Sequence, residues 1–317
     1  MYWLFRSGKL DFSLVGKSLH MGYGWLACLT CIFCQALFSS FRWKILLRIG
    51  TQAPLPAWSM IRLTWIGLFF NSVLPGAVTG DFIKMLYARD LDKNLSKTYL
   101  LTSVLMDRIL GLFGLLFLLG LFSIFNYNAV IAVSPKIKNL LHFNFLLFAG
   151  VIVFFATLFL KRSIQELILK YCLVIPKLGK FIHNTLQQVW LIGRHKKAVF
   201  TCLAMSMALQ FSNILAFYFI SSPFYGVEVS LPHVFTFIPI GFIAVAIPIT
   251  PAGLGTGHVA FQELFSLFGI QGGSSFFNLY FLCMISINLL GFIPYMLSGK
   301  KHSLSETKEF ENLEAQS

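Results

Sequence analysis

Residues 63–80 read LTWIGLFFNSVLPGAVTG, an apolar stretch that Pro75 and Gly76 interrupt. A second apolar stretch, residues 233–270, is interrupted in the same way, by Pro248, Pro251, Gly253, Gly255 and Gly257. Proline removes a backbone hydrogen bond and glycine weakens a helix, so neither stretch favours one continuous membrane-crossing helix. We expect each stretch to enter the bilayer as a broken, re-entrant segment that returns to its own side.

The composition around these stretches indicates a membrane protein. Of 317 residues, 57% are hydrophobic and 12% are charged, and the mean hydropathy is +0.75. Soluble domains carry about 25% charged residues, so too few charges are present to cover a water-facing surface. The net charge of +13 would suggest a nucleic-acid partner in a soluble protein. Here the basic residues lie in short loops, where they contact lipid headgroups, and we expect no nucleic acid.

Five further segments reach the length of about 20 apolar residues that a membrane span needs. They are residues 21–41, 98–125, 140–160, 198–220 and 274–298. We therefore predict an all-α, polytopic membrane helix bundle with about five full spans and two re-entrant Pro/Gly-broken segments. Residues 1–299 would form this transmembrane domain, with an amphipathic interfacial segment at residues 161–197 and a polar cytoplasmic tail at residues 300–317.

Under this topology, most basic residues lie on one side of the membrane. Nineteen of the 25 Lys and Arg residues, with Arg42, Arg62 and Lys84 among them, fall on one side, and five fall on the other. The positive-inside rule then predicts that the basic side, which includes the C-terminus, is cytoplasmic.

The same topology makes the two broken segments enter from opposite sides of the membrane. Their sequences are also similar, LPGAVTGD at residues 74–81 and TPAGLGTGH at residues 250–258. Two interrupted elements of opposite orientation indicate a possible inverted repeat, which is typical of transporters.

The breaks themselves are candidate binding elements. A helix that begins after a break presents free N–H groups and the positive end of its dipole, which suits an anion such as a phosphate. Asn71 could bond the freed backbone groups before the first break. The alternative is that the breaks only permit close helix packing. The candidate residues are Asn71, Pro75, Gly76, Gly80, Pro251, Gly253, Gly255 and Gly257.

Charged residues near the spans complete the candidate site. Asp107 and Arg108 lie about ten residues into an apolar run, where a charge costs about 2.5–3.5 kcal/mol and usually faces a cavity or a partner. The alternative is that the helix starts later and both residues lie at the interface. Asp81 follows the first break and is expected to cap the next helix. Glu263 is expected to pair with Arg108, and His258 to be a structural hydrogen-bonding group.

Two other motifs have competing interpretations. Asp90 and Asp92 form a D-x-D, which some glycosyltransferases use to hold a metal, although isolated acids in a loop are usually just solvated. Cys28, Cys31 and Cys34 have helical spacing inside a span, and no His or carboxylate lies near them to complete a metal site. No Walker loop, H-E-x-x-H or G-x-S-x-G motif is present. We expect no cofactor, no metal and no catalytic residue.

An ordered set of motifs resembles a known family. The set is Arg42-Trp43, Asn71-x-x-Leu74-Pro75-Gly76, Gly80-Asp81, Asp107-Arg108-x-x-Gly111-Leu112 and Pro251-x-Gly253-x-Gly255. Together they resemble the lysylphosphatidylglycerol synthase transmembrane region family of flippase-like proteins, over nearly the whole chain. The resemblance implies a multi-pass protein of a bacterial or archaeal inner membrane. It also implies a role in lipid transport, because stand-alone members of the family are proposed lipid transporters.

The chain departs from the family pattern in two ways. Family members begin with another hydrophobic span before the segment that matches Lys9-Leu10-Asp11, so we expect one span to be missing at the start. The synthases also carry a large soluble domain that transfers the amino acid, whereas about twenty polar residues follow the last span here. We therefore expect no aminoacyl transfer by this chain alone.

These observations lead to three hypotheses of different classes. The first is a flippase or transporter for a phosphate-bearing lipid, either an anionic phospholipid or a polyprenyl-linked lipid. The second is a membrane transferase that acts on a lipid-linked substrate through Asp90 and Asp92. The third is a non-transporting membrane partner of a lipid synthase or glycosyltransferase.

Overall fold

The computed structural model describes residues 11, 13–20, 22–51, 53–74, 79–128, 135–174, 179–226, 229, 231–246, 250 and 253–298. Every regular element in these ranges is a helix. The helices are α2 (Ser13–His20), α3 (Tyr23–Gly50), α4 (Ala57–Val73), α5 (Thr79–Leu91), α6 (Lys97–Phe125), α8 (Pro135–Leu158), α9 (Arg162–Cys172), α10 (Gly179–Arg194), α11 (Lys196–Ser221), η1 (Ser222–Phe224), α12 (Leu231–Ala246), α13 (Thr256–Leu267), α14 (Gly273–Leu289) and α15 (Phe292–Met296).

The predicted spans are confirmed. Within the described ranges, five helical stretches are long and apolar enough to cross a membrane: Tyr23–Gly50, Lys97–Phe125, Leu141–Leu158, Lys196–Phe224 and Gly273–Met296. The chain is therefore a polytopic membrane helix bundle. The first span is longer than its apolar run, because no Gly or Pro stops α3 between Phe41 and Gly50. The charged residues that follow Phe41 consequently belong to a helix and not to a loop.

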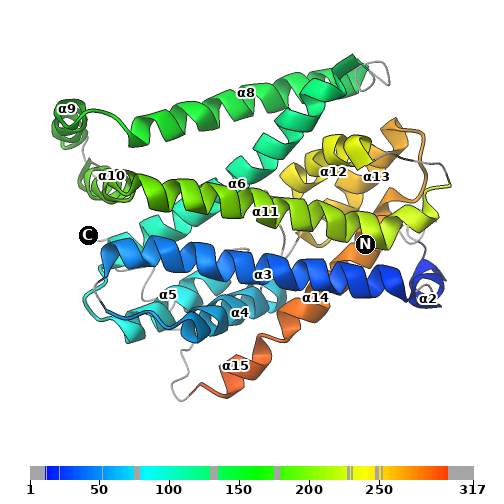
Figure 1. Cartoon of the computed structure of the whole chain (residues 1–317), viewed down its shortest axis with the longest axis horizontal. Coiled ribbons are helices and arrows are strands. Elements are labelled where there is room, and N and C mark those ends of the chain that lie inside the picture. Colours follow the sequence, from blue (N-terminus) through cyan, green and yellow to red (C-terminus); the bar gives the residue numbers. More distant parts are fainter. Residues whose placement is uncertain are drawn as a thin grey trace.

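Each broken segment forms a hairpin of two shorter helices that contact each other. The first hairpin is α4 with α5, and the second hairpin is α12 with α13. Figure 1 shows the two hairpins toward opposite ends of the long helices α3 and α11. Contacts along α6 agree, because the first hairpin reaches Arg108 and the second reaches Phe122. These two positions are 14 residues apart, or about 21 Å along the helix.

The buried apolar side chains form two main clusters, one around each hairpin. The first cluster surrounds α4 and α5 and includes Trp43 and Leu47 of α3. The second cluster surrounds α12 and α13 and includes Cys28 and Ile32 of the same helix. Helices α6 and α11 are divided between the clusters in the same way. The three long helices therefore connect two cores, each built on one hairpin.

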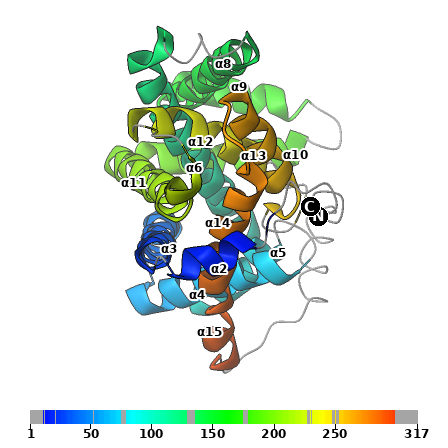
Figure 2. The ribbon, with the colours of Figure 1, turned by 90° about the vertical axis from the view of Figure 1, so that its right-hand side faces the viewer.

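Helix α11 contacts both of the other long helices closely. A Cβ added to Gly114 of α6 would lie 2.6 Å from the carbonyl oxygen of Ser206, and one added to Gly24 of α3 would lie 2.9 Å from that of Phe219. Cβ atoms essentially never come this close to a neighbour, so glycine is needed at both crossings. Viewed along the long helices, α8 lies at the opposite edge of the bundle from α4 and α15 (Figure 2).

The segment at residues 161–197 forms the helix pair α9 and α10, at the same end of the bundle as the start of the first hairpin (Figure 1). Trp190 of α10 donates from Nε1 to the carbonyl oxygen of Thr157 at 3.0 Å, which attaches this pair to the end of α8. The predicted tail at residues 300–317 lies outside the described residues.

Candidate functional site

The tip of the first hairpin is closed by a side chain and by two glycines. Asn71 accepts a hydrogen bond at Oδ1 from the backbone N–H of Gly80, at 2.8 Å. Gly80 itself lies against Gly67, and a Cβ on Gly80 would fall 1.9 Å from the Gly67 carbonyl oxygen. Asn71 thus bonds a freed backbone group, as predicted, while Gly80 permits α5 to approach α4. Pro75 and Gly76, in the break between them, lie outside the described residues.

Next to this tip, Asp81 is bound by two cations. Arg108 of α6 donates from Nε to Oδ2 of Asp81 at 2.9 Å and also contacts it through Nη2. Lys84, one turn along α5, places Nζ 3.1 Å from Oδ1 of the same carboxylate. Asp81 lies in the first turn of α5, so its negative charge also faces the positive end of that helix dipole. The predicted capping residue therefore holds the hairpin to α6.

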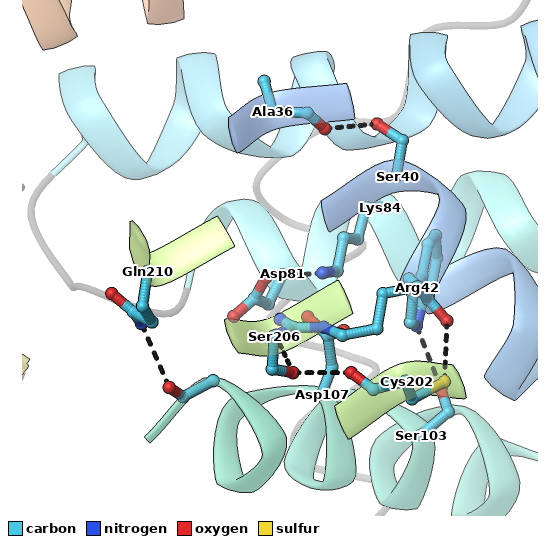
Figure 3. A network of polar contacts seen from close by, with 12 residues as sticks. Ala36, Ser40, Arg42, Asp81, Lys84, Ser103, Asp107, Cys202, Ser206 and Gln210 are labelled. Atoms are coloured by element: carbon cyan, nitrogen blue, oxygen red, sulfur yellow. Dashed lines mark hydrogen bonds and ion pairs between the residues drawn. The ribbon is translucent and has the colours of Figure 1, made fainter. Parts of the chain in front are cut away.

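A second ion pair links three long helices beside the first (Figure 3). Arg42 of α3 donates from Nε to Oδ1 of Asp107 at 2.7 Å, and from Nη1 to the Ser206 hydroxyl of α11 at 2.8 Å. Its guanidinium lies against Gly111, whose added Cβ would be 3.5 Å from Nη1. The Lys84 ammonium lies 4.6 Å from the centroid of the Trp43 ring, a cation–π distance that joins the two ion pairs through α3.

We name these five side chains, Arg42, Asp81, Lys84, Asp107 and Arg108, the charge cluster. Three cations and two carboxylates leave it with one excess positive charge. Four of its side chains are between 5% and 12% exposed, whereas that of Arg108 is 39% exposed. Buried charges persist only where they are paired, so the four buried groups are mutually compensated. Arg108 is therefore the most exposed member of the charge cluster.

Two members of the charge cluster were assigned to loops by the sequence interpretation. Arg42 and Lys84 were counted among the basic residues of one membrane side, but they are only 4% and 6% exposed inside the bundle. The i,i+3 spacing of Asp81 and Lys84 was the signal that could have identified Lys84. For Arg42 the signal was the uninterrupted helical sequence from Phe41 to Ile49. Asp107 and Arg108 do lie within a span and face partners, as one of the two predictions for them required.

The predicted pairing of Glu263 with Arg108 is wrong. Arg108 pairs with Asp81, while Glu263 is exposed on α13. Glu263 lines a cavity of about 320 Å³ between α8 and the second hairpin, together with the buried Asn144. The direction in which the Glu263 side of α13 points depends on how α13 contacts α14, which the sequence alone does not show.

The second break is built from glycines and one histidine. Gly253 and Gly255 have φ values of 76° and 86°, a region that L side chains rarely adopt. His258 accepts from the Gly255 N–H at Nδ1 (3.3 Å), and its Nε2 lies 3.3 Å from Asn278 Oδ1. His258 is therefore a structural hydrogen-bonding group, as predicted. Gly257 lies against the Phe277 ring, because a Cβ added to Gly257 would fall 2.2 Å from the ring atom Cζ. Pro251 lies outside the described residues.

Helix α14 contacts the tips of both hairpins. Asn278 meets His258 of the second hairpin, and Asn288 donates to the Ser72 hydroxyl of the first hairpin at 2.9 Å. The two asparagines are ten residues apart, or about 15 Å along the helix. The breaks are thus brought to one helix, but these contacts do not bring them into one pocket.

Asp92 of the D-x-D motif forms hydrogen bonds with two loop residues. Asp92 accepts from the Thr51 hydroxyl and, at 2.9 Å, from the Asn94 backbone N–H. The Thr51 hydroxyl, followed by the Asn94 N–H, lowers the pKa of Asp92 below its usual value. The Asp92 carboxylate therefore connects the end of α3 to the loop before α6. The six cysteines, Cys28, Cys31, Cys34, Cys172, Cys202 and Cys283, are free thiols.

Comparison with known proteins identifies the family. The chain has no match among curated proteins or solved structures. A family described as the lysylphosphatidylglycerol synthase TM region matches residues 1–293, which include both hairpins, the charge cluster and all five spans up to Ile293. On the strength of this match, the chain belongs to the lysylphosphatidylglycerol synthase transmembrane region family.

Proposed function

We propose that this membrane protein translocates a phosphate-bearing lipid, either a phospholipid or a lipid-linked substrate, and that Arg108 binds its headgroup. The observation that carries the proposal is the charge cluster, with one excess positive charge and one member, Arg108, that is more than a third exposed. A protein that only needed to hold its helices together could use neutral pairs, because buried ion pairs are rarely more stable than apolar contacts.

The geometry supports an exchange of anions at Arg108. Both contacts of Arg108 with Asp81 go to one oxygen, Oδ2, while Lys84 contacts the other oxygen. A phosphate that binds Arg108 competes with Asp81, and Lys84 still compensates the carboxylate when Arg108 turns away. Guanidinium groups bind phosphate through two parallel hydrogen bonds, so the competing anion can match the contacts it replaces.

This exchange would act on the attachment of α5 to α6. Asp81 lies in the first turn of α5, so loss of the Asp81–Arg108 pair removes an ion pair that holds the start of α5 to α6. A ligand shifts an equilibrium between two arrangements only if it binds one of them better. The lipid headgroup would satisfy this condition, because it binds Arg108 only in the released arrangement.

The experiment is transport in proteoliposomes that contain fluorescent phosphatidylglycerol. We expect the wild type to move the lipid between leaflets and Arg108→Ala to lower the rate about tenfold or more, since a charge-assisted contact is lost. Arg162→Ala is the matched control, because Arg162 is 80% exposed and pairs with Glu166 on the surface. Gly255→Leu, at the second break, is expected to lower the rate as well.

Two outcomes would reject the proposal. One is that the purified wild type moves no fluorescent or native lipid. The other is that Arg108→Ala and Gly255→Leu both retain the wild-type rate. In either case a non-transporting role beside a lipid synthase or glycosyltransferase becomes the better hypothesis, and co-purification with such an enzyme would test it.

We further propose that the protein lies in a bacterial or archaeal inner membrane with the α9–α10 end in the cytoplasm. Helices α9 and α10 and the start of α11 carry many of the basic residues at this end, such as Arg162, Lys170, Arg194, Lys196 and Lys197. The positive-inside rule assigns such an end to the cytoplasm.

A further inference from the structure

A groove lies on the outside of the bundle, and the proposed transport does not use it. Its volume is about 490 Å³, and it lies between α3, α4 and the α14–α15 end of the chain. Phe33 and Leu37 of α3, Trp65 of α4 and Ile293 of α15 form its apolar walls. The volume falls within the range of about 300–1,000 Å³ that is usual for small-molecule sites.

Of the described residues that line the groove, one is charged, Arg62 of α4. Arg62 is half-buried, and no ion pair or hydrogen bond to it is found among the residues that the structure describes. A cation beside an apolar wall is costly without a counter-ion. Arg62 also lines a neighbouring recess of about 200 Å³ that includes Ser59 and Asp90, so it stands between the apolar groove and a recess that contains polar side chains.

An exposed tryptophan indicates where this boundary lies in a membrane. Trp58, one turn before Arg62 on α4, also lines the groove and is 68% exposed. Tryptophan is enriched at the level of the lipid headgroups, where its ring is apolar and its N–H is hydrated. Arg62 would therefore lie just inside that level, with the rest of the groove beside the acyl chains.

From this combination we infer that the groove binds one anionic glycerophospholipid, with an acyl chain against Phe33, Trp65 and Ile293 and its phosphate on Arg62. The walls match a hydrocarbon chain, and the unpaired guanidinium matches the one anionic group of such a lipid. The apolar walls would lie at the depth of the acyl chains, and Arg62 would lie near the depth of the lipid phosphate.

The site is separate from the charge cluster. Gly67, on the same helix as Trp65, faces α5 at the hairpin crossing. Residues two positions apart on an α-helix point about 200° apart, so the groove is on the opposite face of α4 from the side that leads to Asp81. Lipid binding at Arg62 therefore goes beyond the proposed transport and can be measured whether or not any lipid crosses the membrane.

The test is photo-crosslinking of phosphatidylglycerol that carries a diazirine in one acyl chain, in nanodiscs that contain the full chain. We expect labelling of α4 and of residues 290–297, and about a tenfold or greater loss of it in Arg62→Gln, since a charge-assisted contact is removed. Arg89→Gln is the matched control, because Arg89 is an exposed cation in the last turn of the same hairpin. It removes the same charge without lining the groove, and should leave the labelling unchanged.

A second variant fills the groove without disturbing the core. Ile293 is 56% exposed, so Ile293→Trp should fold normally and abolish the labelling while Arg62 is intact. Phosphatidylcholine with the same diazirine chain carries the same phosphate beside a cationic choline, so it should label the wild type more weakly and lose less labelling in Arg62→Gln than phosphatidylglycerol does.

Three results would overturn the inference. Equal losses in Arg62→Gln and Arg89→Gln would mean that only the general positive charge attracts the lipid. Unchanged labelling in Ile293→Trp would mean that no chain occupies the groove. Crosslinks from residues 290–297 to a second copy of the protein, in place of lipid, would mean that the groove is a protein–protein contact. Transport measured on the same variants is a separate readout, so either proposal can fail without the other.

Discussion

Arg42 and Asp107 join α3 to α6 through a bond of 2.7 Å between Nε and Oδ1, and both side chains are less than a tenth exposed. Arg42 also reaches α11 through the Ser206 hydroxyl. One buried pair therefore fixes the relative positions of the three helices that connect the two apolar clusters. This arrangement makes the pair the first target for a stability experiment.

Asp107→Ala should destabilise the protein by about 3–5 kcal/mol, because it leaves the Arg42 charge buried without its partner. The measurement is the thermal unfolding temperature in detergent. The control is Glu166→Ala, which breaks the exposed Arg162–Glu166 pair and should cost less than about 1 kcal/mol. Equal shifts for the two variants would show that the buried pair does not stabilise the bundle. Replacing both partners, Arg42→Met with Asp107→Leu, should restore part of the loss.

Gly114→Ala should separate α6 from α11. The new Cβ would lie 2.6 Å from the Ser206 carbonyl oxygen, and this backbone atom can move only with its helix. We expect a loss of about 1–3 kcal/mol, as in other overpacked interiors.

Gly150→Ala is the matched control for that change. Gly150 is exposed in the middle of α8, and in the described part of the chain no atom lies within 4 Å of an added Cβ, so alanine should stabilise this helix by about 0.5–1 kcal/mol. If both variants unfold at the same temperature, close approach at Gly114 is unimportant.

Gly255→Ala separates backbone conformation from available space. Among the described residues, no atom lies within 4 Å of a Cβ added at Gly255 or at Gly150, but the φ of Gly255 is 86°. Strain alone should therefore destabilise Gly255→Ala by about 1–3 kcal/mol while Gly150→Ala is stabilised. The unfolding temperatures of the two variants test this difference, and a stabilised Gly255→Ala would mean that the second break relaxes without strain.

The proposed orientation has a direct test in intact cells. Single cysteines at His20 and Arg194, in a variant without the six native cysteines, lie at opposite ends of the bundle on exposed residues. A membrane-impermeant maleimide added outside should label His20→Cys and leave Arg194→Cys unlabelled until the cells are opened. The reverse pattern would place the α9–α10 end outside and contradict the cytoplasmic assignment.

Hydropathy and helix-breaking residues predicted the bundle because both act locally. The five spans follow from apolar length, and the hairpins follow from Pro75, Gly76 and the glycines after Pro251, where a helix cannot continue. The match of Asn71 to a freed backbone group followed from the same reasoning.

The charge cluster could not be predicted in the same way, because it depends on which helices meet. A basic residue after an apolar run was interpreted as a loop residue, and this rule misplaced Arg42, since α3 runs on to Gly50. Lys84 was misplaced because the returning helix α5 is itself buried. Glu263 was expected to pair with Arg108 because it is the only acid between Glu228 and Glu306 in the sequence. Pairing is decided by helix faces, however, and the face of α13 with Glu263 points outward.

The division of α3 between two cores has a consequence for how the chain is made. Cys28 lies in the second cluster together with Cys283, near the far end of the chain, whereas Trp43 lies in the first cluster with residues of α4, α5 and α6. During synthesis the C-terminal half of α3 can therefore meet α4, α5 and α6 early, while its N-terminal half meets α11 later and α14 later still. Helix α3 thus precedes the other long helices but is fully enclosed only after α14 is made, and truncation before α14 would leave the Cys28 side of α3 without its Cys283 neighbour.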